Sequence, residues 1–224
     1  MSDRLQFAGK IVLGVVLMGA AYCAGCGRVD AWPGWCFSGF FLMMLTASDL
    51  VLVRVAPDLV VERVSWPADA MRWDKQIVSW LAIAPIVTCL VAGLDARRNG
   101  VPVVNSRVLI GYGVAVVAAS LIHTAMAVNR FYAPTVRIQV EREHKLVDAG
   151  PYRLVRHPGN LGNILLNLAT PLMLASRWAW VPVALSALLT IIRTMLEDHM
   201  LSVQLTGYQA FSQQTRSRLL PGVW

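Results

Sequence analysis

The sequence predicts an all-α integral membrane protein with five to six transmembrane helices. Of its 224 residues, 56% are hydrophobic and only 15% are charged, and the mean hydropathy is +0.55. Soluble domains carry about one quarter charged residues, so water-soluble globular classes are disfavoured. A membrane span needs about 20 apolar residues, so the chain has room for five or six spans in a single membrane domain, 1–224.

Six apolar segments account for the expected spans, and polar segments at 54–75, 95–106 and 129–160 separate several of them. The last two apolar segments are short enough to form one tight helical hairpin. We therefore expect four N-terminal spans within 1–128, followed at 129–224 by a catalytic loop, the helical hairpin and a C-terminal tail. The apolar segments lie near residues 7–26, 35–53, 76–94, 107–128, 161–176 and 178–196.

Basic residues are divided unevenly between the two predicted sides of the membrane. If all six segments cross, 15 Lys and Arg lie with the N-terminus, the 54–75 and 129–160 segments and the tail, and 5 lie on the other side. Because positive loops favour the cytoplasm, we expect a multi-pass protein of the cell (inner) membrane with its polar segments on the cytoplasmic face. The net charge of +7 then indicates contact with the anionic lipid bilayer, and no nucleic-acid partner is predicted.

Two further features concern the first half of the chain. Pro57–Lys75 interleaves apolar and charged residues, and with Trp66 and Trp73 as aromatic anchors it is interpreted as a surface connector at the lipid headgroups. Asp49 and His123 lie within predicted spans, where an ionisable group is costly unless it faces the bundle interior or a cavity. Each either lines a substrate cavity or joins two helices.

The densest group of functional side chains lies between Glu141 and Asn163. Gly150-Pro151 and His157-Pro158-Gly159 are turn signals, so this segment is not one continuous helix. Irregular backbone beside a bilayer must be buried in protein or line a wet cavity, because its peptide groups need partners. The segment is therefore either a binding site or a basic loop that fixes the topology.

A second polar cluster follows the last apolar segment and contains Arg193, Glu197, Asp198 and His199. Arg193 and Glu197 are four residues apart and share a helix face, so they form either a stabilising ion pair or part of a binding site. Their position beside the polar loop favours binding. No hydrolase triad order, zinc-protease motif, Walker loop or GxGxxG motif is present, and the histidines lack metal-ligand spacing, so no metal is predicted. A transfer reaction that needs alignment and charge stabilisation suits this inventory.

Short motifs follow one another in a fixed order from Glu141 onward. They are His144-Lys145-Leu146-Val147, Gly150-Pro151-Tyr152-Arg153, Arg156-His157-Pro158 with Gly162, Arg193 with Glu197-Asp198, Gly207-Tyr208 and Leu220-Pro221-Gly222. Together they resemble the isoprenylcysteine carboxyl methyltransferase and phospholipid methyltransferase superfamily. After the His-Pro pair that family usually has a small residue and then an aromatic, whereas this chain has Gly159 and Asn160, which leaves a hydrogen-bonding amide.

The resemblance implies that S-adenosylmethionine binds in a cytoplasm-facing pocket of the C-terminal spans and loops, while a small or lipid-like acceptor enters from the membrane. It implies that Glu197 holds the cofactor through its ammonium group and that Arg193 is the catalytic residue that orients the acceptor. An arginine fork suits a carboxylate or phosphate, and thiol and amine acceptors stay open. The implied cofactor-binding residues are His144, Lys145, Leu146, Val147, Tyr152, His157, Pro158, Gly159, Asn160 and Glu197.

Two other functions stay open. Membrane sterol reductases look similar over the same C-terminal region and bind NADPH in a comparable pocket, often with an H-P-N-Y element followed by a carboxylate. Residues 159–163 provide neither that tyrosine nor a nearby acid. The other alternative is a non-catalytic membrane protein on the same scaffold, which the missing aromatic at Asn160 favours. The sequence predicts neither the acceptor's identity nor the oligomeric state.

Overall fold

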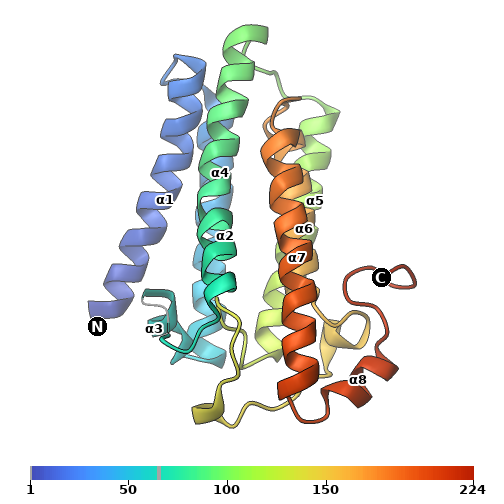
Figure 1. Cartoon of the computed structure of the whole chain (residues 1–224). Coiled ribbons are helices and arrows are strands. Elements are labelled where there is room, and N and C mark those ends of the chain that lie inside the picture. The colour runs from blue at the N-terminus through green and yellow to red at the C-terminus, as the bar shows by residue number, and fades with distance from the viewer. Residues whose placement is uncertain (1, 65–66) are drawn as a thin grey trace.

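The computed structural model describes residues 2–64 and 67–224, and the regular structure within them is entirely helical (Figure 1). This confirms the predicted all-α fold. The elements are α1 (Ser2–Cys26), α2 (Trp32–Val55), α3 (Leu59–Val64), α4 (Arg72–Asn99), α5 (Ser106–Val128), η1 (Val140–Arg142), η2 (Gly150–Arg153), α6 (Pro158–Met173), α7 (Trp180–Gln204) and α8 (Tyr208–Gln214).

Among the described residues, five helices are long and apolar enough to cross a membrane: α1, α2, α4, α5 and α7. The sixth long helix, α6, has 16 residues, which corresponds to about 24 Å and falls short of the roughly 20 residues of a full span. The predicted hairpin therefore pairs one short helix with one full-length helix. α7 continues to Gln204, beyond the apolar segment that ends near residue 196, so Arg193 and Glu197 lie in one helix, as their spacing predicts.

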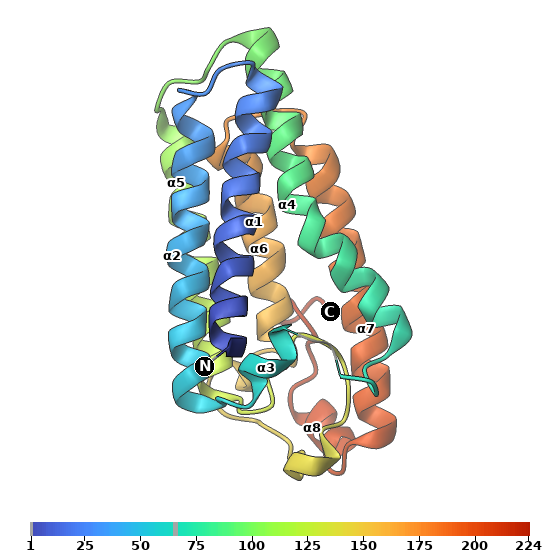
Figure 2. The same cartoon turned by 90° about the vertical axis from the view of Figure 1, so that its left-hand side faces the viewer.

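The six long helices form a closed ring. Extensive contacts join α1 to α2, α2 to α5, α5 to α6, α6 to α7, α7 to α4, and α4 back to α1. All six run along the long axis of the molecule, as Figures 1 and 2 show from two sides. A hydrophobic core that includes Tyr22, Phe37 and Met173 fills part of the ring. Beyond this core, toward the end that carries the N-terminus, the ring contains a cavity.

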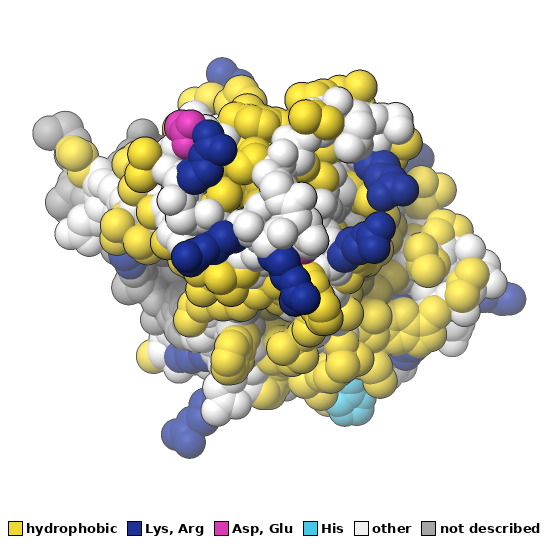
Figure 3. Space-filling view, turned by 90° about the horizontal axis from the view of Figure 1, so that it is seen from above, with side chains coloured by type: hydrophobic (Ala, Val, Ile, Leu, Met, Phe, Trp, Pro, Cys, Tyr) yellow, Lys and Arg dark blue, Asp and Glu magenta, His cyan; other side chains and the backbone are white. Residues whose placement is uncertain are grey.

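The two ends of the ring are built from different segments. Short connections at 27–31, 100–105 and 174–179 close one end, whereas the N-terminus, α3, the segment after α5 and α8 gather at the other (Figures 1 and 2). The structure thus brings together the segments that the sequence places on one side of the membrane. Figure 3 looks onto the end with the short connections, where basic side chains surround apolar surface. Its exposed arginines are Arg28, Arg97, Arg98, Arg107 and Arg177.

Polar caps explain two of the helix starts. The side chain of Asn105 accepts hydrogen bonds from two backbone N–H groups in the first turn of α5. Asp95 of α4 accepts hydrogen bonds from the hydroxyl of Ser176, at 2.6 Å, and from the backbone N–H of Arg177, at 2.9 Å, just before α7 begins. The carboxylate therefore satisfies backbone donors at this turn and ties α4 to the hairpin.

The interpretation of Pro57–Lys75 as a surface connector is wrong in part. Leu59 and Val60 of α3 are buried, and Asp74 in the first turn of α4 is completely buried. Trp66 lies outside the described residues. The segment therefore supplies interior side chains, because α3 packs against α1 and α2 at the open end of the ring.

The two ionisable groups predicted within the spans have different surroundings. The Nε2 atom of His123 lies 2.8 Å from the hydroxyl of Ser48 and 3.2 Å from the carbonyl oxygen of Met44, so His123 joins α5 to α2. Asp49, one residue after Ser48, lines the cavity. Both expectations for such groups are thus met, each by one of the two residues.

Close packing of α5 on α6 generates a prediction about two glycines. A Cβ atom at Gly111 would lie 2.6 Å from the backbone nitrogen of Met173, whereas a Cβ atom at Gly113 would meet nothing within 4 Å. We expect Gly111→Val to lower the stability of the detergent-purified protein by about 1–3 kcal/mol, because the helices must separate. Gly113→Val, on the same helix, is the matched control and should leave the thermal unfolding midpoint unchanged. Equal midpoints for both variants would contradict this packing.

Candidate functional site

A cavity of about 450 Å³ lies within the ring at the end that carries η1, η2 and α8. This volume falls in the range of roughly 300–1,000 Å³ that is usual for small-molecule sites. All six long helices contribute to its wall, together with the segment between α5 and η1. The part toward α1, α2 and α4 is mainly apolar and includes Phe7, Phe41, Met44, Leu45, Val78 and Leu81. The part toward α7 and the loops carries the predicted polar residues.

The structure brings ten of the eleven predicted site residues to this one cavity. They are His144, Lys145, Leu146, Val147, Tyr152, His157, Gly159, Asn160, Arg193 and Glu197. The exception is Pro158, which is not among the lining residues. It occupies the first turn of α6, where its fixed φ and missing N–H suit a helix start.

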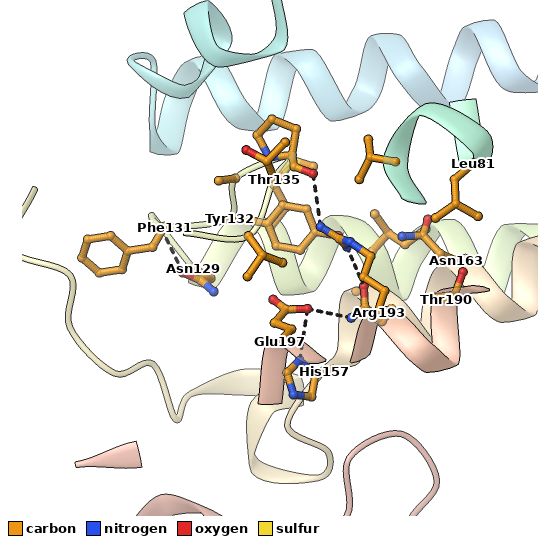
Figure 4. Close-up of a pocket in the computed structure, with 18 of the residues that line it drawn as sticks. Leu81, Asn129, Phe131, Tyr132, Thr135, His157, Asn163, Thr190, Arg193 and Glu197 are labelled. Atoms are coloured by element: carbon orange, nitrogen blue, oxygen red, sulfur yellow. Dashed lines mark hydrogen bonds and ion pairs between the residues drawn. The ribbon is translucent and has the colours of Figure 1, made fainter. Parts of the chain in front are cut away.

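The guanidinium of Arg193 lies between the two parts of the cavity, with Glu197 on one side and Leu81 and Thr190 on the other (Figure 4). Its Nε atom donates to Asp74 Oδ1 at 2.6 Å, and its Nη2 atom donates to Asp74 Oδ2 at 3.4 Å. Nη2 also donates to the carbonyl oxygen of residue 134 at 3.2 Å. Arg193 is therefore held mainly by a buried carboxylate from α4.

Asn160 connects Arg193 to Glu197. Its Nδ2 atom donates to Glu197 Oε2 at 2.9 Å, and its Oδ1 atom accepts from Arg193 Nη1 at 3.2 Å. The ion pairs found in the described part of the chain do not include a direct one between Arg193 and Glu197, although helical spacing allows it. A Cβ atom at the preceding Gly159 would collide with the ring and hydroxyl of Tyr132. An aromatic ring thus lies against the start of α6, but it comes from the loop.

His157 lies between two carboxylates. Its Nδ1 atom is 3.6 Å from Glu197 Oε2, and its Nε2 atom is 3.2 Å from Asp198 Oδ1. Burial lowers the pKa of His157, but hydrogen bonds to Asp198 and Glu197 outweigh burial and hold this pKa above its usual value. The imidazolium has a donor for each acid. Glu197 nevertheless keeps 24% of its side chain exposed, at the cavity wall, so it is accessible to a cationic ligand.

Asp198 is the centre of a buried cluster that fixes the C-terminal segments. Its oxygens accept hydrogen bonds from Arg156 at 2.8 and 3.0 Å, from the hydroxyl of Tyr208 at 2.7 Å, and from Arg218 at 2.8 Å. Together with His157, these contacts hold the start of α6, α8 and the tail around α7. Asp198 was not among the predicted site residues. The available signal was its place as the second of two adjacent acids in the motif.

The segment between α5 and η2 forms an aromatic wall. The ring of Phe131 stacks on His144, with centroids 4.5 Å apart and an angle of 27° between the planes. The Nδ1 atom of His144 accepts a hydrogen bond from the backbone N–H of Gln139 at 3.4 Å. Burial and two nearby arginines lower the pKa of His144, so its ring is neutral at pH 7. This wall offers apolar faces for a planar ring system.

Several residues of the site were missed by sequence reasoning. Asp74 was assigned to a surface connector, and Phe131, Tyr132 and Thr135 precede the motifs that begin near Glu141. In the sequence, Asp74 is visible as an acid at the start of an apolar segment, and Phe131 and Tyr132 as an aromatic pair just after a predicted span. Neither pattern predicts which side chains these residues contact, because the contacts form between distant parts of the chain.

The likeness to a known protein family lies in the part of the chain that carries most of the predicted site residues. Residues 110–203 match the Isoprenylcysteine carboxyl methyltransferase (ICMT) family model. This match confirms the predicted resemblance. The family match covers most of α5 and α7 and all of α6, and it excludes Asp74.

Two relatives show the extent of the likeness to this family. The "Probable protein-S-isoprenylcysteine O-methyltransferase" of Oryza sativa subsp. indica and that of subsp. japonica are each 40% identical to this chain over 48 residues, which is 21% of this chain. The chain spans about a quarter of the length of these curated relatives. With five apolar helices of spanning length, the family match describes a multi-pass membrane protein.

Substitution of Asp198 should release the C-terminal segments that its cluster holds. Asp198→Asn leaves the buried guanidinium of Arg156 without its counter-ion, and breaking a buried pair in this way costs about 3–5 kcal/mol. We expect limited proteolysis to cleave the chain after α7 much faster in this variant. His199→Ala, at the exposed neighbouring position, is the control and should behave as the native chain. Unchanged protease resistance of the tail in Asp198→Asn would show that the cluster does not hold it.

The surroundings of His157 predict a pH dependence of stability. Because its pKa is raised on folding, the stability that its protonation contributes is present below its ordinary value of 6.5 and is lost as pH rises through the folded-state value. We expect the thermal unfolding midpoint to fall with rising pH above 6.5, and His157→Gln to reduce this slope. Parallel profiles for the two proteins would contradict the assignment of the charge to His157.

Proposed function

We propose that the protein is an integral-membrane methyltransferase that uses S-adenosylmethionine and transfers its methyl group to a small or lipid-like acceptor. The observation that carries the proposal is Glu197. Its carboxylate is held by His157 and Asn160 and stays accessible at the wall of a cavity that continues into an apolar chamber within the ring. The family match and the names of the relatives support the same reaction class.

The residues present fit this cofactor. The accessible carboxylate of Glu197 would hold its ammonium group, since charge-assisted hydrogen bonds are the strong ones. The ammonium group of Lys145 is mostly exposed and lies 3.6 Å from Glu143. It would pair with the carboxylate of the cofactor. Leu146, Val147 and Phe211 give the wall an apolar stretch beside which the adenine would lie. The wall therefore offers a partner for each chemical part of the cofactor.

When bound, S-adenosylmethionine supplies a methyl group on a positively charged sulfur, which keeps the bonding electron pair when the acceptor attacks the methyl carbon in line. Such a displacement requires alignment, exclusion of water and balanced charge rather than a covalent enzyme intermediate. Arg193 lies between the cofactor part and the apolar part of the cavity, where its remaining N–H bond would orient the acceptor. The excess of Lys and Arg in the segments at this end supports a site that faces the cytoplasm.

A direct test is calorimetric titration of the detergent-purified protein with S-adenosylhomocysteine, which retains the ammonium group. We expect Glu197→Gln to weaken binding at least tenfold, equivalent to about 1.4 kcal/mol or more, because the charge is removed while the shape is kept. Asp148→Asn is the control, since Asp148 is an exposed acid that does not line the cavity and, in the described part of the chain, has no ion pair with a residue that does, and it should bind as the native chain does.

The proposal fails if folded native protein does not bind S-adenosylhomocysteine. It also fails if the native chain and Glu197→Gln bind it equally well, because the carboxylate would then not be its anchor. NADPH serves as a second ligand in the same titration, and saturable binding of NADPH alone would favour a reductase instead.

A further inference from the structure

The guanidinium of Arg193 has little hydrogen-bonding capacity left for a ligand. Asp74 occupies Nε and one N–H bond of Nη2, the carbonyl of residue 134 takes the other, and Asn160 takes one N–H bond of Nη1. A single N–H bond of Nη1 remains. An arginine that recognises a carboxylate as a fork needs two parallel N–H bonds, which this arrangement does not provide.

The other cations at the cavity wall are also paired. Arg156 is held by Asp198, and Lys145 lies 3.6 Å from Glu143. Arg137 contacts three carboxylates, of which Glu62 and Glu141 are at 2.6 Å. Every lysine and arginine that lines the cavity in the described part of the chain therefore has an acidic partner.

Asp49 adds an acidic side chain to the apolar part of the cavity. It lines the wall from α2, and its Oδ1 atom is buried without a hydrogen-bond partner among the described residues. The acceptor part thus contains an Arg193 whose charge is balanced by Asp74 and an acidic side chain, Asp49, that offers an anionic head group no hydrogen-bond donor.

We propose that Asp74 is a positioning residue that selects the class of acceptor. By occupying one edge of Arg193 and cancelling its charge, it makes the apolar part of the cavity select an uncharged or cationic head group over a carboxylate. This inference rests on the proposed function in treating the bound molecule as a methyl acceptor. The binding preference itself does not require methyl transfer.

The position of Asp74 makes this role a fixed one. Its side chain is completely buried, it does not line the cavity, and its Oδ2 atom also accepts the backbone N–H of Val136 at 2.6 Å. The carboxylate is therefore anchored on the side of Arg193 away from the ligand and cannot swing aside. Asp74 lies outside residues 110–203, the segment that matches the family model, whereas Arg193 lies inside it.

The test compares three probes of equal chain length: octylamine, octanol and octanoate. Each is titrated calorimetrically into the protein in an uncharged detergent, without S-adenosylmethionine. We expect the native chain to bind octylamine and octanol roughly tenfold more tightly than octanoate. Asp74→Asn should gain roughly tenfold in affinity for octanoate while its affinity for octanol stays the same. Loss of packing alone would not produce such a gain.

Asp95→Asn is the matched control, because Asp95 is a buried acid on the same helix that has no contact with Arg193. It should keep the native preference. If Asp74→Asn does not fold, Asp49→Asn provides the second variant, and it should raise the affinity for octanoate because it replaces an acid at the cavity wall by an amide that can donate a hydrogen bond.

A native chain that prefers octanoate overturns the inference. So does a folded Asp74→Asn, or failing that a folded Asp49→Asn, that gains no affinity for octanoate. Binding of S-adenosylhomocysteine is measured separately, so failure of the cofactor site and failure of the acceptor preference give different results.

Discussion

One continuous chain of hydrogen bonds and ion pairs crosses the interior of the protein, and the functional end depends on it. It passes in order through Asp74, Arg193, Asn160, Glu197, His157, Asp198 and Arg156. Acids and bases alternate along it, with the Asn160 amide between the first cation and the next acid. Buried charges are tolerated when each has partners of opposite charge and good geometry. Because the members come from α4, α6, α7 and the loop before α6, the same contacts that balance charge also fix how these helices meet.

The match to the methyltransferase family covers only part of the cavity wall. Residues 110–203 supply Glu197, Asn160 and Arg193, whereas the apolar wall from α1, α2 and α4 lies outside the match. The wall around Arg193 thus comes partly from the matched segment and partly from α1, α2 and α4. Asp74, on α4, is a residue through which the unmatched part of the chain contacts Arg193.

Much of this architecture is predictable because hydropathy and charge act locally. Apolar segments predict the long helices, and the gathering of polar segments at one end brings ten predicted residues to one cavity. The hydrogen-bond partners of each side chain are harder to predict, because they come from segments that approach one another only in the folded structure. Helical spacing suggests that Arg193 meets Glu197, but Asn160 from α6 inserts between them and Asp74 from α4 takes the guanidinium. Nothing local to Asp74 distinguishes it from a surface acid at a helix start.

The length of α6 matters for a cavity that would bind both a water-soluble and a lipid-like molecule. Its 16 residues fall about 6 Å short of a hydrocarbon layer of about 30 Å, so the loop that carries residues 150–157 takes up the remaining depth. A lipid leaflet beside α6 faces this hydrophobic mismatch and adjusts by thinning. At this end the cavity wall combines polar side chains from the loop with apolar side chains from the helices. One cavity therefore has surfaces for both a charged molecule and an amphiphile.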